Sequence, residues 1–115
     1  MKKKIITATF SLFITGFCFA QSQLEMNQQA NTDYLKADAE MAKVFKKVQK
    51  VTTTAKEKKL LLDAQRTWIK FKEAHCKSAV EVYNGGSIQP LVYSTCLKQL
   101  TEERTKQLNK YLKTN

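Results

Sequence analysis

The side chains best suited to chemistry are a neighbouring histidine and cysteine, His75 and Cys76. A Cys–His pair is typical of a thiolate nucleophile and its base. Consecutive residues on a helix point in different directions, so this pair is poorly placed for proton transfer. His75 is also the only histidine of the chain, whereas a metal site needs three or four converging ligands. The sequence therefore predicts no catalytic site, no metal and no cofactor.

A disulfide is the alternative role for Cys76. Beyond residue 20 the chain contains one other cysteine, Cys96. Cys76 lies nine residues before Gly85, and Cys96 lies nine residues after Ser87. If two helices fold back at this turn, both cysteines lie about 13.5 Å from it, at matching height. Closely packed helices bring Cα atoms within the roughly 7 Å that a disulfide requires. We therefore predict a Cys76–Cys96 bridge, which leaves no thiolate for catalysis.

The first twenty residues have the pattern of an export signal. Three consecutive lysines precede an uncharged, mostly apolar segment at residues 5–17, and the triplet 18–20 provides small side chains at cleavage positions −3 and −1. As a helix the apolar segment spans only about 20 Å, less than the ~30 Å core of a membrane. We expect cleavage after Ala20 and no transmembrane anchor. The bulky Phe17 argues against a lipid anchor on Cys18.

Export determines both the compartment and the charge of the mature protein. We predict a signal peptide at residues 1–20 and one domain at residues 21–115, located in the periplasm or secreted. Exported proteins fold in oxidising surroundings, which agrees with the predicted bridge. Loss of the three lysines lowers the formal net charge from +10 to +7.

The first expected helix carries an apolar stripe with spacings of three and four residues. A capping-box pattern that starts at Ser22 predicts where this helix begins. The β-branched run at residues 51–54 weakens helix formation and predicts where it ends. The stripe consists of Tyr34, Ala37, Met41, Val44, Val48 and Val51.

Two further helices complete an all-α fold. A second capping box, Thr54 to Glu57, begins the next helix, and Asn84-Gly85-Gly86 ends it. Its apolar stripe is Leu61, Ala64, Trp68, Phe71, His75, Ala79 and Val82. Ser87 caps a third helix with Pro90 in its first turn. The stripe of that helix is Tyr93, Leu97, Leu100, Arg104, Leu108 and Tyr111. The prediction is a small three-helix bundle, or an array of helical hairpins, with one disulfide.

Three large side chains in these helices receive structural roles. Trp68 is expected to be buried where the second and third helices meet, since it offers more apolar area than any other residue. Arg66 and Arg104 are expected to anchor helix ends or acids such as Asp38, in preference to binding a ligand.

Seven short segments occur in a characteristic order: Glu25-Met26-Asn27, Ala37-Asp38-Ala39-Glu40, Ala64-Gln65-Arg66-Thr67-Trp68, Cys76, Gly85-Gly86-Ser87, Cys96, and Leu100-Thr101 followed by Arg104. This series resembles the LprI-like N-terminal domain, a family of small exported bacterial proteins named for a lysozyme inhibitor. The resemblance covers nearly all of residues 21–115. It implies a helical, cysteine-bridged domain outside the cytoplasm, and lysozyme inhibition, an activity of few members. Many members carry a further cysteine where this chain has Gln28 and Gln29, so any second bridge is missing here.

A lysine cluster lies around the turn between the first and second helices. Seven lysines fall within seventeen residues, opposed only by Glu57. Lysines at the end of the first helix complement its dipole, but Lys58 and Lys59 lie in the first turns of the next helix, where positive charge is unfavourable. A solubilising surface is the simpler reading, and a contact surface is the functional one. The cluster comprises Lys43, Lys46, Lys47, Lys50, Lys56, Lys58 and Lys59.

Two hypotheses for function follow, neither of them enzymatic. The protein is an inhibitor that binds a lysozyme-like enzyme, or an envelope-associated helper that docks on anionic lipid or an acidic partner through the lysine cluster. Net charge opposes encounter with a basic lysozyme, but the catalytic carboxylates of its cleft attract a lysine-bearing loop. We expect no nucleic-acid partner, because the protein is predicted to be exported and its lysines lack aromatic platforms.

The first prediction concerns processing. Protein recovered from the periplasm of its producing cell should have the intact mass of residues 21–115 and no thiol that alkylates before reduction. Retained residues from the first twenty would refute the signal peptide, and two alkylated thiols would refute the bridge.

Overall fold

The computed structural model describes the backbone of residues 9–114 and the side chains of residues 21–114. Within that range the chain forms three α-helices and a short 3-10 helix, with no strand. The helices are α1 (Thr9–Val51), α2 (Ala55–Ala79) and α3 (Gln89–Thr114), and the 3-10 helix η1 (Glu81–Tyr83) follows α2. The predicted all-α class is confirmed.

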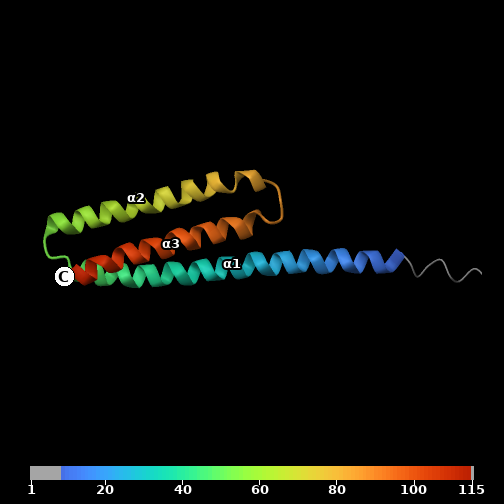
Figure 1. Cartoon of the computed structure of the whole chain (residues 1–115), viewed down its shortest axis with the longest axis horizontal. Coiled ribbons are helices and arrows are strands. Elements are labelled where there is room, and N and C mark those ends of the chain that lie inside the picture. The colour runs from blue at the N-terminus through green and yellow to red at the C-terminus, as the bar shows by residue number, and fades with distance from the viewer. Residues whose placement is uncertain (1–8, 115) are drawn as a thin grey trace, which may run out of the picture.

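The three helices pack as a slender bundle. In Figure 1, α3 lies between α2 and α1: it runs antiparallel to α2 and beside α1 in the same direction. The N-terminal part of α1 continues past the turn that joins α2 to α3 (Figure 1). Short connections join α2 to α1 at one end and to α3 at the other, and α2 lies beside α3 along its length (Figure 1).

The start of the first helix was predicted wrongly. Ser22 lies inside α1, which already includes Thr9, so the capping-box pattern at Ser22 does not begin a helix. Apolar residues before Ser22 favour continued helix over a cap. The predicted signal peptide falls partly outside the described residues, at 1–8, and cleavage after Ala20 stays a prediction. None of the helices in the described part of the chain is both long and apolar enough to cross a membrane.

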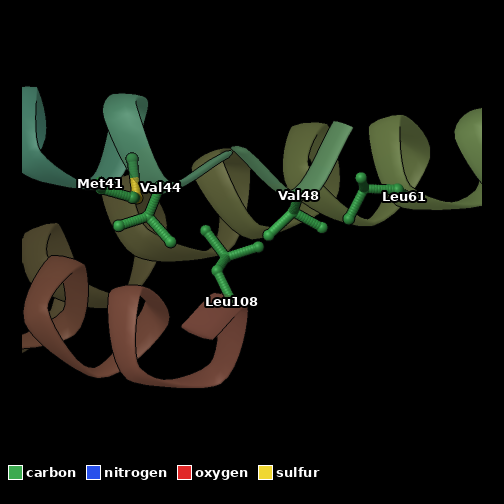
Figure 2. Close-up of a cluster of buried hydrophobic side chains, with 5 residues drawn as sticks. All are labelled: Met41, Val44, Val48, Leu61 and Leu108. Carbon is green, nitrogen blue, oxygen red and sulfur yellow. The ribbon is translucent and has the colours of Figure 1, made fainter. Parts of the chain in front are cut away.

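The apolar core lies towards the end of the bundle where α1 meets α2. Figure 2 shows its five buried side chains, three of which come from α1: Met41, Val44, Val48, Leu61 and Leu108. The stripe predicted for α1 is confirmed at its centre, since these positions repeat every three or four residues and all face α3 or α2. Val51, predicted at the end of the stripe, is exposed instead.

The packing face of α2 is offset by one residue from the predicted stripe. Ala64, Phe71 and His75 are exposed. The residues directly after them are buried instead: Gln65, Lys72 and Cys76. Because two of these side chains are polar or charged, apolar spacing alone pointed to the wrong face.

Trp68 lies at the edge of this face and is only partly buried, where full burial was predicted. It packs against the apolar core, and its ring centroid lies 5.0 Å from the Lys72 ammonium. The offset of α2 explains why Trp68 is not fully buried, because the buried face of the helix is centred on Gln65 and Lys72 and Trp68 lies to one side of it.

The connections on either side of α2 match their sequence signals in part. The Thr54 hydroxyl accepts from the Glu57 amide at 3.1 Å and the Thr54 amide donates to the Glu57 carboxylate at 3.3 Å, which confirms the second capping box. α2 ends before the expected glycines, and Gly85 provides the turn with a φ of +79°, a conformation that favours glycine. α3 begins two residues after Ser87, so Ser87 does not directly precede the helix.

The core predicts a stability contrast between two leucines. Leu108 is fully buried, and its replacement by Ala should lower the free energy of unfolding by about 2–5 kcal/mol. Leu35→Ala, at an exposed leucine of α1, is the control and should change it by less than about 0.5 kcal/mol. Urea denaturation of both variants measures the difference. Equal effects would contradict the assigned core.

Candidate functional site

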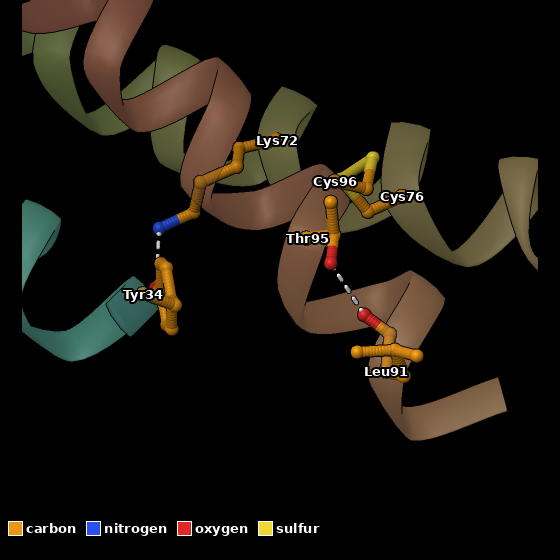
Figure 3. Close-up of a disulfide and its surroundings, with 6 residues drawn as sticks. All are labelled: Tyr34, Lys72, Cys76, Leu91, Thr95 and Cys96. Carbon is orange, nitrogen blue, oxygen red and sulfur yellow. Dashed lines mark hydrogen bonds between the residues drawn. A yellow bond between two sulfur atoms is a disulfide. The ribbon is translucent and has the colours of Figure 1, made fainter. Parts of the chain in front are cut away.

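The predicted disulfide is present and joins α2 to α3. Cys76 and Cys96 have Cα atoms 5.7 Å apart, and Cys76 is fully buried (Figure 3). His75, next to it in the chain, is exposed and its ring lies 5.4 Å from that of Phe71. A bridged and buried sulfur has no thiolate to offer. The arrangement at His75 and Cys76 therefore has no nucleophile.

A second connection between α2 and α3 is polar. Arg104 Nε donates to Gln65 Oε1 at 2.9 Å, and Gln65 Nε2 donates to the sulfur of Met41 at 3.6 Å. Arg104 was predicted to hold a helix end or an acid such as Asp38; the amide of Gln65 takes that place. Burial lowers the pKa of the Arg104 guanidinium below its ordinary value, while Tyr111 acts in the opposite direction. The pair links all three helices.

A buried lysine forms a third connection, between α2 and α1. Lys72 Nζ donates to the Tyr34 hydroxyl at 2.9 Å, as Figure 3 shows, and lies 5.2 Å from the centroid of the Tyr34 ring. The Trp68 ring is also near the ammonium, so two aromatic rings stabilise the positive charge of Lys72. Sequence reasoning missed Lys72. Its spacing of seven from Gln65 and four from Cys76 places all three on one helix face.

The turn between α2 and α3 is held against α1 as well. Asn27 Nδ2 donates to the Ser87 carbonyl at 3.0 Å, across sixty residues of sequence. Asn27, Gln65, Arg104, the two cysteines and Ser87 all belong to the segments quoted above for the family resemblance. Their contacts are with one another or with the helices, so these motif residues build the bundle. Residues 21–114 also hold no group of three metal-ligating side chains.

The lysine cluster, by contrast, is exposed in full. All seven side chains lie at or near the end of the bundle where α1 stops at Val51 and α2 begins at Ala55. Lys59 forms an ion pair with Asp63 at 2.6 Å, and both side chains are largely exposed. Exposed pairs of this kind contribute little to stability. Folding therefore leaves the charges of this surface available to solvent or to a partner.

The structure adds three lysines to this surface that the sequence reading had not included. Because α3 runs beside α1 in the same direction, its C-terminal end reaches the same end of the bundle (Figure 1). Its exposed lysines there are Lys106, Lys110 and Lys113. Their spacing of four and three was visible, but the direction of α3 relative to α1 was not. We call the lysine cluster together with these three residues the cationic end.

A cleft of about 760 Å³, lined by both apolar and polar side chains, opens within the cationic end. It lies between the α1–α2 turn and the last turns of α3, and its wall includes Lys50 and Glu57. Three of its lining side chains are apolar yet exposed: Val51 at 39%, Leu60 at 58% and Tyr111 at 45%. Exposed apolar side chains beside lysines are typical of an interaction surface for a partner that presents apolar and acidic groups together.

The α2–α3 turn at the opposite end of the bundle is uncharged. Residues 82–97, which form the α2–α3 turn and the start of α3, contain no Asp, Glu, Lys, Arg or His. The exposed lysines are therefore concentrated towards the cationic end and are not spread evenly along the molecule. A solubilising role does not require this separation.

The polar connection between Gln65 and Arg104 predicts a coupling energy. Replacing either residue by Leu should destabilise the fold by about 1–3 kcal/mol, since a buried polar partner is left unsatisfied. The double variant should lose about 1 kcal/mol less than the sum of the two. Arg66→Leu, at an exposed arginine on α2, is the control. Additive losses in denaturant titrations would show that the two side chains do not act as a pair.

Comparisons with known proteins support the family resemblance that the motif residues indicated. The family model described as lysozyme inhibitor LprI matches residues 18–108. An uncharacterized protein of Rhizobium meliloti (strain 1021) is 34% identical over 106 residues, which cover 81% of this chain and 76% of the relative. No solved structure matches the chain. Since one family model spans most of its length and a relative of similar extent accompanies it, the chain belongs to the lysozyme inhibitor LprI family.

Proposed function

We propose that the protein is an exported, non-enzymatic binding protein that inhibits a lysozyme-type enzyme, and that the cationic end is its contact surface. The observation that carries the proposal is the concentration of ten exposed lysines from three helices at one end of the bundle. Family membership supports the class of partner. The contacts of Asn27, Gln65, Arg104 and the two cysteines within the bundle support the location, since these motif residues are occupied in the fold.

The chemistry of the partner fits such a surface. Lysozymes cleave their polysaccharide with a pair of carboxyl groups in an open cleft. Ammonium groups near those carboxyl groups would pair with the ionised one and block access of the substrate. Lys56, Lys58 and Lys59 are suited to this role, because they project from the first two turns of α2, and the capping box at Thr54 fixes where those turns begin.

A second candidate is supported by the apolar side chains at the same end. Leu60 and Tyr111 are exposed among the lysines, and basic surfaces with exposed apolar groups bind the interface of anionic membranes. In this alternative the protein is an envelope-associated helper, held on anionic lipid through the cationic end. Both candidates place it in the periplasm or outside the cell.

Charge reversal at the start of α2 tests the contact surface. The variant Lys56→Glu, Lys58→Glu, Lys59→Glu should weaken binding to lysozyme by about tenfold or more, since attraction becomes repulsion. Binding by the unmodified protein should also weaken as salt rises and the Debye length falls below about 8 Å. The fold should persist, because acids in the first turn of a helix are favourable.

The matched control reverses three exposed cations of α2 outside the cationic end: Arg66, Lys70 and Lys77. It changes net charge by the same amount and should bind within about twofold of the unmodified protein. Protection of bacterial cell walls from lysozyme in solution supports the inhibitor, whereas sedimentation with anionic vesicles and no effect on lysozyme supports the envelope helper. If both triple variants behave like the unmodified protein in both assays, the lysines only solubilise the protein.

A further inference from the structure

We infer that the cleft beside Leu60 is the anchor site of the interface and receives an apolar side chain that stands next to acidic groups on the protein partner. This inference rests on the proposed function and adds the chemistry of the group that the cleft accepts. The cationic end then has two parts with different tasks, an apolar centre and a charged rim.

Leu60 is exposed although its neighbour in the sequence is buried. In the run Leu60-Leu61-Leu62, the middle leucine is buried in the core, whereas Leu60 is 58% exposed. The core is complete without it, so packing does not require an apolar side chain there. Leaving a leucine in water forgoes the roughly 25 cal/mol per Å² that burial provides. A partner that covers Leu60 recovers this free energy.

The cleft is also formed before any partner arrives. On one side, the Thr52 hydroxyl and amide both donate to the Val48 carbonyl, at 2.7 and 3.1 Å, and end α1. On the other side, the capping box of Thr54 and Glu57 fixes the start of α2. Leu61 anchors α2 to the core behind the cleft. A preformed site loses little conformational entropy on binding.

Charge determines which occupant fits. Lys50 lines the cleft directly, and the other exposed lysines of the cationic end belong to the same end of the bundle. The one acid in the wall, Glu57, is already engaged by the Thr54 amide. An apolar side chain flanked by carboxylates is therefore complementary to the site, whereas one flanked by cations is repelled. Interfaces of this kind have an apolar anchor at the centre and a polar rim.

The two parts predict different kinetics. An anchor acts after contact and controls dissociation, whereas rim charges mainly steer association. Leu60→Gln should raise the dissociation constant for animal lysozyme by about tenfold, mostly through faster dissociation, with an unchanged salt dependence. The triple lysine reversal should instead slow association and reduce the salt dependence. Surface plasmon resonance with immobilised lysozyme at several salt concentrations measures both rates.

Leu35→Gln is the matched control, because Leu35 is 54% exposed on α1 away from the cleft. It should bind like the unmodified protein, and Leu60→Met, which keeps an apolar side chain, should bind within about threefold. Thermal unfolding verifies that each variant folds. No binding by the unmodified protein would overturn the proposed function and this inference together. Binding that Leu60→Gln leaves unchanged, or that Leu35→Gln weakens equally, would overturn the inference alone.

Discussion

The Cys76–Cys96 disulfide is the constraint on which the arrangement of the helices depends. The face that α2 turns towards the bundle is partly polar, and its one buried residue in the core cluster is Leu61, about 22 Å along the helix from Cys76, with Trp68 packed partly against that cluster. The disulfide fixes the far end of α2, and closing a loop of twenty residues contributes about 3 kcal/mol in the chain-entropy model. Between these points, Gln65 and Lys72 connect α2 to α3 and α1. A slender bundle with a small core needs such connections.

These connections explain why the residues that identify the family are not the residues that we propose to bind. Asn27, Gln65, Arg104 and the cysteines are occupied in holding the helices and the α2–α3 turn together. With the fold secured by buried contacts, the exposed side chains at the other end of α2 carry no structural duty. The cationic end and its cleft occupy that position. We therefore place the proposed binding surface on the exposed residues of the cationic end and not on the motif residues that hold the fold.

Local signals in the sequence were mostly reliable, apart from the helix starts expected at Ser22 and Ser87, and signals that depend on packing were not. The centre of the α1 stripe, the capping box at Thr54 and the disulfide each follow from spacing along one helix or one hairpin, and all three are present. The packing face of α2 was missed because Lys72 is buried through contacts with Tyr34 and Trp68 on two helices. Lys106, Lys110 and Lys113 were missed because their place at the cationic end depends on the direction of α3 beside α1.

The central claim is that one end of the bundle binds and the other does not. Hydrogen exchange of the mature protein with and without saturating lysozyme tests it most directly, because every backbone amide reports separately. We expect added protection at residues 47–61 and 106–114, around the cleft, and none at residues 82–90 of the uncharged turn. Protection confined to residues 82–90, with unchanged exchange around Leu60, would contradict the account.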